Sequence, residues 1–125
     1  MVTRILVIED NEQNLYLTRF ILERGGLDVV EARDGKAGLA AARDASPELI
    51  LLDIQLPGMD GFEVARALRG DPGTATTPIV ALTSFIMAED RARLMEAGCD
   101  GMIEKPIDPE GFLDEVLGYM EPDRA

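Results

Sequence analysis

Residues 48–61 read ELILLDIQLPGMDG and contain the feature that decides the fold. Four consecutive apolar residues, Leu49–Leu52, run straight into an aspartate, and Pro57 and Gly58 follow as a turn signal. An unbroken apolar run of this length is typical of a strand in a parallel sheet, because helices cover both faces of such a strand. The stretch therefore predicts a central parallel strand that delivers Asp53 to the edge where the strand ends.

Apolar runs of the same kind alternate with amphipathic segments along the whole chain. Strands are predicted over Ile5–Ile8, Leu27–Ala32, Leu49–Leu52, Ile79–Leu82 and, more weakly, Met102–Glu104. Helices are predicted over Asn11–Arg24, Gly35–Asp44, Gly61–Arg69, Ala88–Ala97 and Pro109–Met120. Five strand–helix units in succession predict an α/β fold, a doubly wound parallel sheet with helices on both faces.

The composition indicates a single acidic domain. A chain of 125 residues fits one domain, and we assign residues 1–121 to it and residues 122–125 to a short tail. The net charge of −12 argues against a nucleic-acid partner bound through its phosphates. Apolar runs are too short to cross a membrane, and a single cysteine suits a reducing compartment. We therefore expect a cytoplasmic protein with neither a membrane nor a nucleic-acid partner.

Charged and hydroxyl side chains stand where the predicted strands end. The set comprises Glu9 and Asp10 after the first strand, Asp53 after the third, Thr83 after the fourth and Lys105 after the fifth. Ligands of an open parallel sheet bind at the carboxyl ends of its strands. Three carboxylates, a hydroxyl and an ammonium group are therefore expected on one rim of the sheet.

Three carboxylates on one rim require a compensating positive charge. Two like charges ~4 Å apart cost roughly 4 kcal/mol at an effective dielectric constant of ~20. Mg²⁺ prefers oxygen ligands and binds one or two carboxylates together with phosphate oxygens, so it suits this set. With Mg²⁺ and Lys105 beside it, an ionised Asp53 could attack phosphorus and form an aspartyl-phosphate. The Thr83 hydroxyl could then donate a hydrogen bond to that phosphate.

Four motifs carry a resemblance to a known family. They are VIED at 7–10, LLDIQLPGMDG at 51–61, ALTS at 81–84 and EKP at 104–106. Their order and spacing resemble the receiver domain of bacterial two-component response regulators, over essentially the whole chain. The resemblance implies the flavodoxin-like receiver fold, (βα)5 with strand order 2-1-3-4-5. Further strings, among them EDNEQN and GCDGMIEKPI, are similar to those of stand-alone, single-domain regulators of the DivK-like type.

The resemblance also implies the roles of residues around the acceptor. Asp53 resembles the phospho-acceptor of the family. Glu9 and Asp10 resemble the acidic pair that holds Mg²⁺, with Asp10 as a direct ligand and Glu9 acting through water. The backbone carbonyl of Gln55 is implied as a further metal ligand.

Other implied roles concern the conformational switch. Thr83 resembles the switch hydroxyl and Lys105 the lysine that pairs with the phosphate, with a cis peptide bond before Pro106. Met102 stands where the family usually has tyrosine or phenylalanine, so a rotating aromatic side chain is not expected here. Any switch is then expected to act through Thr83 and the loop that carries Phe85, whose bulk should also slow loss of the phosphoryl group.

Two features of the sequence bear on its partners: the absence of histidine and an apolar surplus on the first predicted helix. The sequence has no histidine, so a phosphohistidine donor must belong to another chain, a histidine kinase or a histidine phosphotransfer protein. The resemblance implies a downstream protein target for the face of the fourth helix and the fifth strand and helix. Leu15 and Tyr16 add to an apolar surplus on the first helix, which indicates either a docking face or a generous core. The oligomeric state stays open between a monomer and a weak dimer.

There are three alternatives to a phospho-acceptor regulator. An aspartate-nucleophile phosphatase generally has a second acid two residues after the nucleophile, where this chain has Gln55. A receiver-like module that binds partners without phosphorylation does not need the full set of rim residues. A nucleotide or flavin module is disfavoured because EDNEQN is no glycine-rich phosphate cradle. We therefore expect a phospho-acceptor regulator and not a conventional enzyme.

Overall fold

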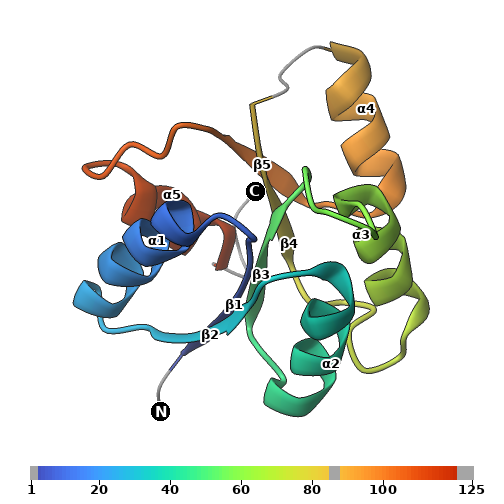
Figure 1. Ribbon diagram of the computed structural model, residues 1–125, viewed down its shortest axis with the longest axis horizontal. Coiled ribbons are helices and arrows are strands. Elements are labelled where there is room, and N and C mark those ends of the chain that lie inside the picture. Colours follow the sequence, from blue (N-terminus) through green and yellow to red (C-terminus); the bar gives the residue numbers. More distant parts are fainter. Residues whose placement is uncertain (1–2, 85–87, 121–125) are drawn as a thin grey trace.

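The computed structural model describes residues 3–84 and 88–120, which form alternating strands and helices (Figure 1). The strands are β1 (Arg4–Ile8), β2 (Asp28–Ala32), β3 (Leu49–Asp53), β4 (Ile79–Thr83) and β5 (Gly101–Glu104). The helices are α1 (Glu12–Arg24), α2 (Gly35–Ala45), α3 (Gly61–Gly70), α4 (Ala88–Ala97) and α5 (Phe112–Met120). The strands form one parallel sheet in the order β2-β1-β3-β4-β5. The predicted fold class and strand order are confirmed.

Two helical layers enclose the sheet (Figure 1). Helices α1 and α5 lie on one face, and α2, α3 and α4 lie on the other. Successive residues of β1 point to alternate layers, so that Ile5 and Val7 belong to the core under α1 and α5. Leu6 and Ile8 belong to the core under the other three helices. Both faces of β1 are covered, which explains why its sequence is apolar without alternation.

The two central strands that follow β1 in the sheet are the most deeply buried elements. Every residue of β3 and of β4 is buried, including Asp53 and Thr83 at their carboxyl ends. Full burial of one Leu or Ile side chain stabilises a fold by roughly 1.5–3 kcal/mol, so each strand is anchored by several such contributions. The polar residues at their ends therefore project from the most firmly held part of the molecule.

Polar side chains fix the loops on the same rim by capping the helices that follow. The side chains of Asn11 before α1 and Asp34 before α2 each accept a hydrogen bond from the backbone N–H three residues later. Asp60 and Glu63 form a capping box at the start of α3. Such caps typically contribute about 1 kcal/mol each. They hold the chain where it turns away from the strand ends.

The fifth helix begins three residues later than the predicted start at Pro109. Asp108 is the reason, because its side chain accepts the N–H of Glu110 at 3.1 Å and its carbonyl accepts the N–H of Gly111 at 3.2 Å. These bonds form a turn ahead of the helix, and α5 starts only at Phe112. The other predicted boundaries agree with the structure to within one residue.

Within residues 3–84 and 88–120, no helix is long and apolar enough to cross a membrane. Residues 121–125 lie outside the described part of the chain. The division between a domain and a tail at residue 121 therefore stays a prediction.

Candidate functional site

The register of the parallel strands brings the predicted site residues to one level of the sheet. Ile8 pairs with Leu52 in the ladder between β1 and β3, so the residues that follow, Glu9 and Asp53, lie side by side. Asp53 itself pairs with Leu82 of β4. The rim predicted from the sequence is therefore present, with its residues supplied by adjacent strands.

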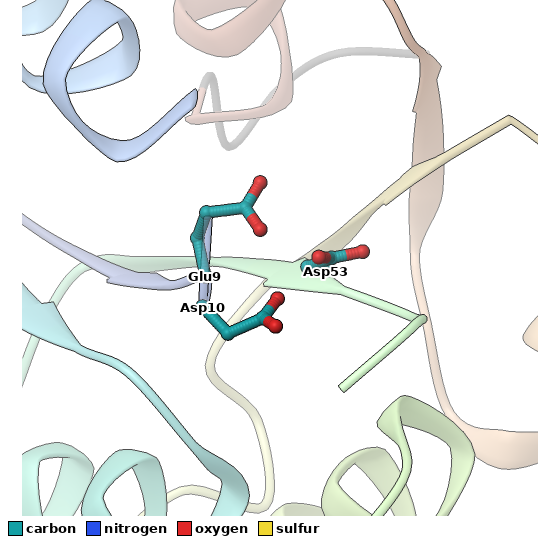
Figure 2. Close-up of side chains that lie close together, drawn as sticks. All are labelled: Glu9, Asp10 and Asp53. Atoms are coloured by element: carbon teal, nitrogen blue, oxygen red, sulfur yellow. The ribbon is translucent and has the colours of Figure 1, made fainter. Parts of the chain in front are cut away.

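Three carboxyl groups meet at this rim (Figure 2). Figure 2 shows Glu9 and Asp10 at the end of β1 with their carboxyl groups directed to the side on which Asp53 lies. One oxygen from each of the three groups lies within 4.8 Å of the others. Glu9 is fully buried and Asp53 is 3% exposed, whereas Asp10 is open to solvent. The cluster thus has two buried members and one at its mouth.

The burial of Glu9 changes its acid–base behaviour. One carboxylate oxygen, Oε2, accepts the N–H of Asn11 at 3.3 Å. The other, Oε1, lies 3.1 Å from the ammonium group of Lys105 but accepts no hydrogen bond of good geometry. Burial, followed by the neighbouring Asp53, raises the pKa of Glu9 to about 7. Without a bound metal, Glu9 therefore keeps its proton to a higher pH than an exposed glutamate does.

Lys105 is the cation of the site. Its Nζ lies 3.1 Å from Glu9 and 3.2 Å from Asp53, and its side chain is 16% exposed. Burial by itself would lower the pKa of Lys105, but the two carboxyl groups outweigh it and the net pKa is raised. The lysine therefore stays charged and partly offsets the repulsion between the carboxylates.

Asp53 is held in one orientation. Its Oδ1 accepts the backbone N–H of Gln55 at 3.0 Å, while Oδ2 faces Lys105. Thr83 ends the neighbouring strand, is 1% exposed, and accepts the N–H of Lys105 through its carbonyl at 2.9 Å. The acceptor candidate, the hydroxyl and the ammonium group are thus brought together by the ends of β3, β4 and β5.

The donor set fits a hard divalent cation. All candidate side-chain ligands are carboxylate oxygens, the kind that Mg²⁺ prefers. A buried carboxylate oxygen without a well-aligned hydrogen bond, Glu9 Oε1, is costly in the absence of a further partner. Glu9, Asp10 and Asp53 are the residues that would hold the ion. The predicted role of the Gln55 carbonyl stays a prediction.

The residues assigned to the switch have mixed outcomes. The peptide bond between Lys105 and Pro106 is cis, as expected. Met102 is half-buried and packs against the core under α2, α3 and α4. Phe85 lies outside the described residues. The conformational roles of these residues stay predictions.

The docking role considered for two residues of the first helix is wrong for one of them. Leu15 is 2% exposed and belongs to the core under α1 and α5, so it does not reach a partner. Tyr16 is 71% exposed, as a docking residue requires. Its ring stacks on Phe20, which is 47% exposed and was not among the docking residues named from the sequence. The spacing of four residues between the two aromatic side chains was the signal that identifies Phe20.

Comparisons with known proteins agree with this geometry. The family model described as the response regulator receiver domain matches residues 5–117. The polar-differentiation response regulator DivK of Brucella ovis is 37% identical over 120 residues, which cover 96% of this chain and 98% of that protein.

Solved structures give the same result. The chemotaxis response regulator CheY4 of Vibrio cholerae superposes with a TM-score of 0.91 at 28% identity, covering 95% of this chain and 99% of that one. The receiver domain of the sensor histidine kinase PA1611 from Pseudomonas aeruginosa has a TM-score of 0.87 at 27% identity, covering 96% and 98%. That structure is described as having a magnesium ion coordinated in the active-site cleft.

Proposed function

The chain belongs to the response regulator receiver family and is a two-component response regulator, and from this premise we propose that Asp53 accepts a phosphoryl group from a phosphohistidine. One observation carries the proposal: the Asp53 carboxylate lies 3.2 Å from the Lys105 ammonium and beside two further carboxyl groups. A structural carboxylate would need the lysine but not the extra acids. An acceptor that works with a divalent cation needs both.

The transfer step follows from the chemistry of the two groups. A carboxylate oxygen of Asp53 attacks phosphorus, the new P–O bond forms and the P–N bond to the imidazole breaks. The imidazole keeps the electron pair of the broken bond and takes a proton from solvent. The product is an acyl phosphate on Asp53 and a free histidine on the donor. Because this chain contains no histidine, the donor is another protein.

The surrounding residues orient the acceptor and stabilise charge. The Gln55 N–H holds one carboxylate oxygen of Asp53 and leaves the other directed at Lys105. The ammonium group can then follow the negative charge onto the phosphoryl oxygens. The buried Thr83 hydroxyl stands at the end of the next strand, where it can donate to the same oxygens. Mg²⁺, when bound to Glu9, Asp10 and Asp53, supplies positive charge for the phosphoryl oxygens.

We further propose how the protein meets its partners. The donor is a histidine kinase or a histidine phosphotransfer protein, and the exposed Tyr16 and Phe20 on α1 contribute to the docking face. The relatives named above include a receiver domain of a sensor histidine kinase and the regulator DivK, which supports a kinase as donor. The protein acts in the cytoplasm as a phospho-acceptor, either monomeric or weakly dimeric. It signals to a protein target and is not a conventional enzyme.

Acetyl phosphate, a small-molecule donor, tests the acceptor directly. Incubation of the protein with acetyl phosphate and Mg²⁺ should add one phosphoryl group to the intact mass, and chelation of the metal should abolish the addition. Asp53→Asn should gain nothing, whereas Asp60→Asn, a matched change on the same loop, should gain as much as the wild type. No addition to the wild type would favour a receiver-like module that works without phosphorylation. An equal addition to Asp53→Asn would overturn Asp53 as the acceptor.

A further inference from the structure

Helix α4 buries few of its side chains. Of its ten residues, Leu94 and Ala97 are buried, and Met95 is 55% exposed. In the described part of the chain, α3 is the element that α4 contacts most extensively (Figure 1). Helix α3 is therefore one of the main supports of α4.

One set of contacts between the two helices lies at their carboxyl ends and consists of charged hydrogen bonds from Arg69. The guanidinium group of Arg69, in the last turn of α3, donates to the carbonyl of Gly98 at 2.9 Å and to the side chain of Asp100 at 2.6 Å. It also donates to three carbonyl groups of the loop after α3, the closest being that of Thr77 at 2.7 Å. Charged hydrogen bonds to several acceptors hold this end of α4 as a pivot.

The second contact between the two helices is a single cation–π interaction at the amino-terminal end of α3. The guanidinium carbon of Arg93, on α4, lies 4.1 Å from the centre of the Phe62 ring, in the first turn of α3. Arg93 is exposed while Phe62 is 8% exposed, so the cation covers the outer face of a buried ring. An exposed cation–π contact is weak compared with the Arg69 network, so it can be remade at small cost.

Gly61, the residue before Phe62, ties the first turn of α3 to the chain that follows Asp53. Gly61 donates its N–H to the Ile54 carbonyl at 3.0 Å. A Cβ atom at Gly61 would lie 2.5 Å from the Ile54 backbone and 2.9 Å from the carbonyl oxygen of Asp53, so the first turn of α3 is pressed against the acceptor residue. The capping box of Asp60 and Glu63 holds this turn rigidly. A displacement of the loop after Asp53 must therefore move the Phe62 ring.

We propose that Arg93 is a positioning residue, which couples α4 to the acceptor site by stacking on Phe62, while Arg69 acts as the fixed pivot. The inference rests on the proposed phosphoryl transfer to Asp53 and adds the route by which its outcome reaches α4. This route does not require an aromatic side chain on β5, where the chain has Met102. It predicts that α4 responds to the state of Asp53 and that α5 does not.

Hydrogen exchange with beryllofluoride, a stable mimic of the phosphoryl group, tests the coupling. Bound beryllofluoride is measured by fluorine NMR on the same Mg²⁺-containing samples of the full chain. In the wild type, amide exchange rates within Ala88–Ala97 should change about threefold on binding, because α4 buries few side chains and is expected to open locally, and those within Phe112–Met120 should not. Arg93→Gln and Phe62→Leu should lose at least about half of that response while binding beryllofluoride as the wild type does.

Conservative variants separate coupling from a merely structural role. Arg93→Lys keeps the cation and Phe62→Tyr keeps the ring, so both should retain the response of α4. A structural role would alter exchange equally with and without beryllofluoride and leave the difference unchanged. An undiminished response in Arg93→Gln, or beryllofluoride binding to the wild type without a response of α4, would overturn the coupling alone. A wild type that binds no beryllofluoride would overturn the proposed function and this route with it.

Discussion

The rim around Asp53 and helix α4 are held in the fold by different means. Asp53 ends a strand of five buried residues, and its carboxyl group lies between a backbone N–H and Lys105. Helix α4 buries Leu94 and Ala97, and near its middle Arg93 contacts Phe62 in the first turn of α3. The first region is fixed by a strand buried on both faces, the second by a neighbouring helix.

The difference teaches where chemistry and response can be placed in one small domain. A group that attacks phosphorus must be held to a fraction of an ångström, and a buried parallel strand provides this. A segment that reports the outcome must have two accessible positions, which requires few buried contacts. Helix α3 touches both regions, because its first turn lies against Asp53 and its Phe62 side chain contacts Arg93 of α4.

The largest expected effect comes from breaking the contact between α3 and the rim. Gly61→Ala would place a Cβ atom 2.5 Å from the Ile54 backbone, so the turn after Asp53 must move. We expect a loss of about 3 kcal/mol in the free energy of unfolding, because backbone atoms cannot yield as side chains do. Gly70→Ala at the other end of the same helix meets no atom within 4 Å and should change stability by less than about 1 kcal/mol.

Urea unfolding of the two glycine variants measures this contrast. Equal stabilities for Gly61→Ala and Gly70→Ala would contradict the close packing of α3 on the acceptor strand.

A smaller effect is expected from removing the buried charge of the rim. The pKa of Glu9 is raised to about 7, so the folded protein binds its proton more tightly than the unfolded chain does. Stability without metal therefore falls as the pH rises from about 4.5 to 7, and the loss persists above that window. Glu9→Gln avoids it and should be more stable than the wild type by on the order of 2–3 kcal/mol at pH 8, with little difference at pH 5.

Thermal or urea unfolding in a chelating buffer at the two pH values tests the Glu9 prediction. Asp10→Asn removes a charge from the solvent-exposed member of the cluster and serves as the control with a smaller effect. With Mg²⁺ added the order should reverse, because the ion stabilises the form with the full set of carboxylates. A Glu9→Gln protein that is less stable than the wild type at pH 8 without metal would contradict the buried, unfavourable charge.

The smallest expected effect concerns the helices themselves. Phe112 and Val116 of α5 are fully buried, whereas α4 buries one large side chain, Leu94. Backbone amides in α4 should therefore exchange through openings about 1–2 kcal/mol less costly than those in α5. Native-state hydrogen exchange gives both values in one experiment. Equal opening free energies for the two helices would remove the contrast on which the separate roles of the rim and of α4 depend.

Much of the rim could be predicted from the sequence, for a physical reason. Carboxyl ends of neighbouring parallel strands lie at one edge, so any polar residues that follow buried strands must converge. Asp53, Glu9 and Lys105 were found in this way. The sequence does not show how deeply each of these residues is buried. The full burial of Glu9, and with it the raised pKa, depends on side chains from several elements.

The first helix shows where prediction from pattern fails. Its core-facing stripe consists of Leu15, Thr18 and Leu22, and the polar Thr18 in the middle hides the phase of the stripe. The pattern therefore left Leu15 open between the core and a docking face shared with Tyr16, although the two neighbours point in different directions. The stacking of Arg93 on Phe62 was equally out of reach, because it depends on the distance between two helices far apart in the sequence.

Chemical trapping of the phosphorylated residue tests the central claim most directly. Borohydride reduces an aspartyl-phosphate to homoserine, and trypsin releases residues 44–66, which contain Asp44, Asp53 and Asp60. After incubation with acetyl phosphate and Mg²⁺, sequencing of this peptide should find homoserine at position 53 alone, and none when the metal is chelated. Homoserine at Asp60, at Asp10 in another peptide, or nowhere in the wild type would contradict Asp53 as the phosphoryl acceptor.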